Sequence, residues 1–174
     1  MGLVDRSIRQ HNTEKTIFQR LSGTEWLEES APEEESWRIE DTARFAPILA
    51  DHGVDLLDVS AGGNSARQRI RSGPGYQVPF AAAAKEAVGS RMFVSAVGGL
   101  YEGKVAEAVL QSGNADVVFV GRYFQKNPGQ VWKMAEELDV NIRAANQIQW
   151  GFKGRAAQGL GSNVPTKRGV TCTR

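Results

Sequence analysis

The chain has 174 residues, of which 41% are hydrophobic and 24% are charged, as is typical of a soluble domain with its own core. Its 21 basic and 20 acidic residues give a net charge of +1, which argues against a dedicated nucleic-acid surface. The single cysteine, Cys172, excludes an intramolecular disulfide, and the two distant histidines, His11 and His52, offer no zinc spacing. No apolar run approaches the roughly 20 residues that span a bilayer. We expect a cytoplasmic protein without a membrane partner.

Strand and helix signals alternate along the chain. The apolar runs predict strands at residues 16–21, 54–60, 92–97 and 115–120. Helices are predicted at about 37–52, 79–88 and 102–112, with one more after the fourth strand. In the helix at 102–112 we expect Val105, Ala108 and Val109 to face inward. The acidic stretch from Glu28 to Glu35 is expected to be a solvated surface loop.

The order of these elements predicts an α/β fold. Four β-then-α units follow one another, and their apolar runs are too continuous for half-exposed strands, which indicates parallel strands covered by helices. Four units are half of a (β/α)₈ barrel, which typically needs about 250 residues. We therefore expect a partial (β/α)₈ TIM barrel in residues 1–150, consisting of about four C-terminal βα units. Residues 151–174 are expected to be a disordered tail.

Two successive predicted strands end in glycine. Gly98 and Gly99 follow the third strand, and Gly121 and Arg122 follow the fourth. Barrels of this type bind phosphate in the loops after their last two strands, where glycine lets backbone N–H groups approach a ligand. The alternative is that these glycines only relieve crowding at strand-to-helix turns.

Five motifs occur in a suitable order and at suitable intervals: Phe18-Gln-Arg-Leu-Ser, Gly53-Val-Asp-Leu-Leu-Asp-Val-Ser, Pro74-Gly-Tyr-Gln-Val-Pro-Phe, Ala96-Val-Gly and Val120-Gly-Arg. Together they resemble the C-terminal half of the old yellow enzyme family, which are NADPH-dependent FMN oxidoreductases, and in particular its YqjM-like branch. The resemblance covers residues 15–140.

The resemblance implies an FMN site. Arg20 would reach the flavin ring, where its fixed charge stabilises negative charge on the reduced flavin. Gly98, Gly99, Gly121 and Arg122 would hold the phosphate. From the residues alone, Arg20 could instead pair with a carboxylate at a neighbouring strand end, and Arg122 could be a surface charge.

Other candidate residues are less specific. Ser60 ends the second strand near the expected cofactor but could equally cap a turn. Lys153 or Arg155 could replace the arginine with which the YqjM branch reaches into its neighbour's active site.

The family's remaining flavin-contacting, substrate-binding and proton-donating residues lie on strands that have no counterpart here, so no catalytic residue is assigned. The resemblance implies an FMN-dependent NADPH oxidoreductase of the ene-reductase type in truncated form, acting on an enone or a quinone. The alternatives are a non-catalytic half-barrel that binds FMN weakly or pairs with another chain, and a barrel for a sugar phosphate or nucleotide, which the motif from Pro74 to Phe80 disfavours. A homo-oligomer, or pairing with the missing half-barrel, is expected.

Overall fold

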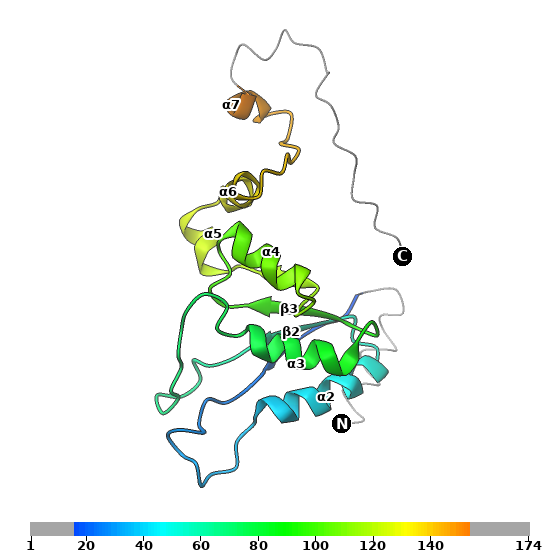
Figure 1. Ribbon diagram of the computed structural model, residues 1–174, viewed down its shortest axis with the longest axis vertical. Coiled ribbons are helices and arrows are strands. Elements are labelled where there is room, and N and C mark those ends of the chain that lie inside the picture. Colours follow the sequence, from blue (N-terminus) through cyan, green and yellow to red (C-terminus); the bar gives the residue numbers. More distant parts are fainter. Residues whose placement is uncertain (1–15, 154–174) are drawn as a thin grey trace. The chain divides into compact units, whose positions relative to one another are not determined.

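The computed structural model describes residues 16–153 of the chain, which divides into two compact units at residue 140. Each unit is described by itself. The first contains every strand and all helices but the last (Figure 1), namely β1 Phe18–Ser22, α2 Ile39–Asp51, β2 Leu56–Ser60, α3 Val78–Val88, β3 Phe93–Val97, α4 Gly103–Gln111, β4 Val117–Phe119, α5 Arg122–Lys126 and α6 Gln130–Glu137. The second contains α7 Gln149–Lys153.

The four strands form one parallel sheet whose order, β1-β2-β3-β4, follows the chain. The predicted α/β class and the parallel strands are confirmed. Each observed strand is shorter than its predicted run or begins later in the chain. Just before β1, the N–H of Ile17 donates to the Asp55 carboxylate at 2.7 Å, and the Ile17 carbonyl accepts from the N–H of Asp55 at 3.0 Å.

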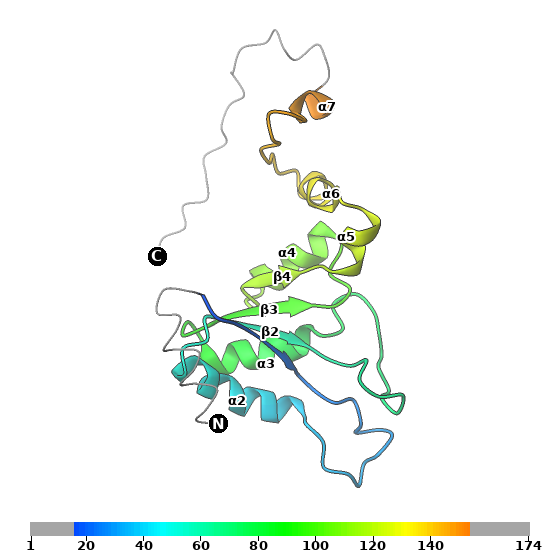
Figure 2. The same cartoon turned by 180° about the vertical axis from the view of Figure 1, so that it is seen from behind.

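Helices α2 and α3 cover one face of the sheet. Figure 1 shows them in front of the strands, and Figure 2 shows the same sheet from its other side. The side chains of Leu57, Val59, Val94 and Ala96 are fully buried in the core on the helical side. Because helices cover these alternating strand residues, they are apolar, and this is why the sequence predicted buried strands here.

On the other face of the sheet, side chains of register partners line up in rows across the strands. Phe18, Leu56 and Phe93 are register partners across β1, β2 and β3. At the two ends of this row, Phe18 is 65% exposed and Phe93 is 61% exposed. Among the described residues, this face therefore carries large apolar side chains in contact with solvent.

One expectation about an individual side chain of α4 needs correction. Ala108 was expected to face inward but is exposed, and Ala106 is buried instead. The cause is α6, since a Cβ built on Gly103 would lie 2.7 Å from the carbonyl oxygen of Met134, so α4 packs closely against α6 as well as the sheet.

The glutamates of the acidic loop are exposed as expected, whereas Ala31 in the same loop is buried, and two of the glutamates form ion pairs. Glu29 pairs with Arg71, and Glu34 lies 2.7 Å from Arg67. The Arg67 hydrogen bond and charge hold the pKa of Glu34 below its ordinary value. These pairs connect the β1–α2 segment to the β2–α3 segment.

Of the expected tail, residues 151–153 form the end of α7, and residues 154–174 lie outside the described part of the chain.

Candidate functional site

A cavity of about 670 Å³ lies where the carboxyl ends of the strands meet the loops that follow them. Its lining residues come from β1, the β2–α3 segment and the segments that follow β3 and β4: Arg20, Tyr76, Gln77, Val97, Gly98, Gly99, Leu100, Tyr101, Phe119, Val120, Gly121, Arg122, Tyr123 and Lys126. All five residues singled out from the sequence as cofactor ligands, Arg20, Gly98, Gly99, Gly121 and Arg122, are in this set. Its volume falls within the roughly 300–1,000 Å³ of small-molecule pockets.

Gly98 and Gly99 are glycines because another segment packs against them. Their φ angles are 105° and 72°, a region that favours glycine. A Cβ on Gly99 would lie 2.3 Å from the carbonyl oxygen of Gly73, and one on Gly98 would lie 2.6 Å from Nε2 of Gln77. The backbone N–H of Gly75 also donates to the Gly98 carbonyl at 3.0 Å. Crowding, the alternative explanation for these glycines, therefore accounts for their backbone geometry, while both still line the cavity.

Gly121 is different. Its φ of −95° is open to any residue, and a Cβ placed on it would meet nothing within 4 Å. Gly121 thus leaves free space at its Cα on a cavity wall, as a glycine next to a bound group would.

The cavity is cationic. Arg20, Arg122 and Lys126 line it, and no carboxylate does. Arg122 and Lys126 are four residues apart on α5, which places them on one helical face. Neither forms an ion pair with any residue between 16 and 153. The two charges are therefore available to an anionic ligand.

Arg20 forms an ion pair and also lines the cavity. Its Nε donates to Oδ2 of Asp58, and its side chain remains 64% exposed at the cavity, whereas the Asp58 side chain is 6% exposed. Ser95 Oγ donates to the other carboxylate oxygen of Asp58 at 2.7 Å. Of the two alternatives that the sequence left open for Arg20, the structure shows the carboxylate partner, and it also places Arg20 in the cavity lining.

Sequence reasoning missed the aromatic part of the wall. Tyr101 and Tyr123 stack with their ring centroids 4.3 Å apart and an interplanar angle of 3°. They lie on segments that follow different strands, so no local pattern pairs them. Lys126 and Asp58 were also missed, although the spacing of Lys126 from Arg122 and the position of Asp58 inside an apolar strand were visible signals.

The other sequence candidates do not join this cavity. The carbonyl of Ser60 accepts a 2.6 Å hydrogen bond from the N–H of Gly23, and Ser60 is not among the lining residues. His52 caps the end of α2, as expected. Lys153 lies in the second unit, and His11, Arg155 and Cys172 fall outside the described residues.

No helix within residues 16–153 is long and apolar enough to span a membrane. No cluster of three or more His, Cys, Asp or Glu side chains there could hold a metal ion.

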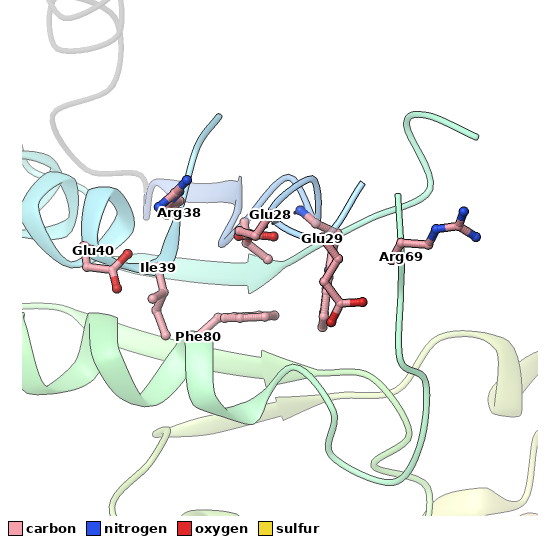
Figure 3. Close-up of a pocket in the computed structure, with 9 residues that line it drawn as sticks. Glu28, Glu29, Arg38, Ile39, Glu40, Arg69 and Phe80 are labelled. Carbon is pink, nitrogen blue, oxygen red and sulfur yellow. Dashed lines mark hydrogen bonds between the residues drawn. The ribbon is translucent and has the colours of Figure 1, made fainter. Parts of the chain in front are cut away.

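A second cavity, of about 310 Å³, lies between the β1–α2 segment and the start of α3 (Figure 3). Glu28, Glu29 and Glu40 line it together with Arg38 and Arg69, over an apolar wall that includes Phe80. Figure 3 shows the Arg69 side chain pointing away from the glutamates. With charges of both signs, this cavity shows no preference for an anion, so the larger cavity is the better candidate site.

Several known oxidoreductases are similar to this chain in sequence. The chain is 50% identical over 149 residues to an NADH:flavin oxidoreductase of Gibberella zeae, matching 82% of this chain and 36% of that protein. It is 34% identical over 137 residues to an NADPH dehydrogenase of a Geobacillus species and 33% identical over 136 residues to one of Bacillus subtilis. These matches take in 79% and 78% of this chain and 38% of each dehydrogenase, so the chain spans little more than a third of these relatives. No family model matches it.

Proposed function

Since the chain belongs to the old yellow enzyme family of flavin oxidoreductases and corresponds to its C-terminal part, we propose that its cationic cavity binds FMN as part of an NAD(P)H-dependent oxidoreductase. One observation carries the proposal. The five residues expected from the sequence to contact FMN line a single cavity that has three cations and no carboxylate.

The residues present fit the phosphate end of FMN. Gly121 leaves open space at its Cα, and Arg122 and Lys126 have no ion-pair partner among the described residues. A guanidinium binds phosphate oxygens in a bidentate manner, and an ammonium adds a point charge. These groups would hold the phosphate through charge-assisted hydrogen bonds.

Arg20 fits the other end of the ligand. It is fixed by Asp58 and exposed to the cavity, so its charge is positioned before a ligand binds. Bound FMN would supply the chemistry of accepting a hydride from the nicotinamide cofactor and passing it to a substrate. Arg20 would stabilise negative charge on the ring without moving a proton, because its guanidinium stays protonated.

The substrate we propose is an α,β-unsaturated carbonyl compound or a quinone. Reduction of an enone needs positioned hydrogen-bond donors at its carbonyl oxygen, and the family places these on strands beyond the region matched here. We therefore assign cofactor binding to this chain and substrate polarisation to a further polypeptide segment, in a complete (β/α)₈ barrel.

The exposed sheet face supports a second candidate, in which the chain acts through pairing. Phe18 and Phe93 are 65% and 61% exposed on the face that a closed barrel would enclose. A half-barrel that binds FMN weakly and pairs with another chain would cover this face.

Titration of the purified chain with FMN tests the cofactor site. Quenching of flavin fluorescence that saturates near one FMN per chain would support it. Arg122→Ala should weaken FMN binding by about tenfold or more, since a hydrogen bond to a charged group contributes roughly 1.5–3 kcal/mol. Riboflavin, which lacks the phosphate, should respond little. Equal losses for the two ligands would mean that Arg122 does not contact the phosphate.

Steady-state assays separate the two candidates. We expect the chain alone to show slow FMN-dependent oxidation of NADPH with oxygen or a quinone and negligible reduction of cyclohexenone, because loss of even one polarising donor costs about 10²–10³ in rate. Adding a polypeptide with the family's first four strands should raise enone turnover. Rapid turnover by this chain alone would refute the division of roles.

A further inference from the structure

Gln68 lies in the middle of the β2–α3 segment and uses both ends of its side-chain amide. Its Oε1 accepts hydrogen bonds from three successive backbone N–H groups, those of Gly63, Asn64 and Ser65, at 2.8, 3.1 and 3.4 Å. Its Nε2 donates to the carbonyl of Glu25 in the β1–α2 segment at 2.8 Å. One side chain thus holds its own segment in a turn and joins it to the neighbouring segment.

The backbone to which Gln68 binds is fixed and strained. The N–H of Glu25 donates to the Trp37 carbonyl at 2.9 Å, and its Oε2 accepts from the Trp37 N–H at 3.0 Å. The next residue, Trp26, has a φ of 55°, in the left-handed region that is costly for a bulky side chain. The N–H of Arg69 donates to the Trp26 carbonyl at 3.1 Å. Gln68 and Arg69 therefore bind two successive carbonyls at a strained residue.

Trp26 connects this junction to the wall of the cationic cavity. Its ring meets that of Phe80 edge to face, with the ring centroids 5.4 Å apart and an interplanar angle of 81°. Phe80 is in the first turn of α3, and Tyr76 and Gln77, which precede that helix, line the cavity. The N–H of Phe80 donates to the Gln77 carbonyl at 3.1 Å. A displacement of Trp26 would therefore reach the cavity through the start of α3.

Other contacts between the two segments are more exposed than that of Gln68. The ion pairs Glu34–Arg67 and Glu29–Arg71 join the same segments, but all four side chains are more than half exposed, so water and salt weaken them. Gln68 is half-buried, whereas residues 63–67 and 69–73 are exposed. Its amide is therefore the side-chain contact best placed to hold the segments together.

We propose that Gln68 is a positioning residue for the cationic cavity, whose Nε2 hydrogen bond to the Glu25 carbonyl keeps the wall formed by Tyr76 and Gln77 in place. The inference rests on the proposed function in taking FMN as the ligand of that cavity. Gln68 is not among the residues that line the cavity, and it acts through the ring contact at the start of α3. A wall that is already ordered loses less freedom when the ligand binds, which favours binding.

Two variants separate the two ends of the amide. Gln68→Glu keeps an oxygen that can accept the three backbone N–H groups, and it replaces the Nε2 donor with a carboxylate oxygen opposite the Glu25 carbonyl. Gln68→Met is close in size and loses both functions. Glu34→Gln is the matched control, because it removes an ion pair between the same two segments and leaves the amide intact.

Hydrogen exchange of the ligand-free chain measures the order of the cavity wall. The N–H groups of Gly75 and Tyr76, which donate to the carbonyls of Gly98 and Gly73, report on the wall, and those of α4 serve as the reference. Gln68→Glu should speed exchange at the two wall positions about threefold or more, with no change in α4.

The affinity for FMN is the second measurement. Gln68→Glu should weaken FMN binding about threefold or more, and Gln68→Met should weaken it at least as much. Glu34→Gln should change both the exchange rates and the affinity by less than about twofold, since an exposed ion pair contributes little.

The inference and the proposed function can fail separately. Unchanged exchange at Gly75 and Tyr76 in Gln68→Glu, or an equal acceleration in α4, would refute the positioning role. Faster exchange at the wall with normal FMN affinity would refute it too. If the wild-type chain does not bind FMN, the proposed function is wrong, and the exchange pattern then decides alone: acceleration confined to the wall supports the role of Gln68, and any other pattern refutes it.

Discussion

Arg20 and Asp58 are register partners on adjacent parallel strands, and the guanidinium Nε donates to the carboxylate Oδ2. The pair is asymmetric, because the arginine side chain is 64% exposed and the aspartate side chain 6%. The buried partner thus fixes the exposed one at the cavity. Ser95, the register partner of Asp58 on β3, occupies the other carboxylate oxygen.

This asymmetry predicts that losing the exposed residue destabilises the fold. Arg20→Met would leave a buried carboxylate with only Ser95 as a partner. We expect a cost of about 2 kcal/mol in the free energy of unfolding, less than the roughly 3–5 kcal/mol for breaking a fully buried pair, because water reaches Arg20. Adding Asp58→Asn should recover most of the loss. Urea unfolding of the two variants measures this, and a double variant less stable than Arg20→Met would contradict it.

The two glycine segments should respond in opposite ways to alanine. Gly99→Ala puts a Cβ 2.3 Å from the Gly73 carbonyl oxygen at a φ of 72°, so we expect a loss of at least about 2 kcal/mol of stability. Gly121→Ala meets open space at a φ of −95°, so the chain should fold normally. Its new methyl group should still weaken FMN binding. Thermal melts and FMN titrations of both variants test this, and normal FMN affinity in Gly121→Ala would place the ligand elsewhere in the cavity.

A pH-dependent contribution to stability is expected from Glu137. Hydrogen bonds, first from Lys133 and then from the backbone N–H of Gly103, lower the pKa of this carboxyl from its ordinary value of 4.5. A lowered pKa in the folded state means that the stabilisation is present above pH 4.5 and is lost as the pH falls through the folded-state pKa. Glu137→Gln should therefore be less stable than wild type near neutral pH, and the difference should shrink on acidification. A difference that is constant with pH would rule out the charge as its source.

The exposed face of the sheet should drive association. We expect the wild-type chain to sediment as an oligomer or aggregate, because Phe18 and Phe93 are exposed there and no strand within residues 16–153 pairs with the outer edge of β1 or β4. Phe18→Thr combined with Phe93→Thr should shift the population toward monomer. Ile48→Thr, on the 40% exposed Ile48 of α2, is the matched control and should change little. A monodisperse wild-type monomer that melts cooperatively would contradict this prediction.

The sequence predicted those features of the fold that depend on residues close together in the chain. Continuous apolar runs identified the four strands, of which β2 and β3 are mostly buried and β1 is mostly exposed. The inward positions of α4 were partly wrong because its packing partner α6 lies further along the chain. Helix α5 was missed because five residues are too few to show an amphipathic period.

In the candidate site, too, the sequence predicted some features and missed others. Residues at strand ends could be placed together, because the carboxyl ends of parallel strands lie at one edge of a sheet. The stacking of Tyr101 on Tyr123 joins residues 22 positions apart in the chain, and the ion pair joins Arg20 to Asp58, 38 positions away. Contacts between residues so far apart in the chain cannot be predicted from local sequence composition.

The order of the strands has a consequence for how the chain acquires its structure. Each strand after the first pairs with the strand that precedes it in the chain. During synthesis, every strand that leaves the ribosome therefore finds its neighbour already present, so the sheet can grow in one direction without waiting for distant sequence. The cavity, whose glycines follow the last two strands, would then form only after β4 has joined the sheet.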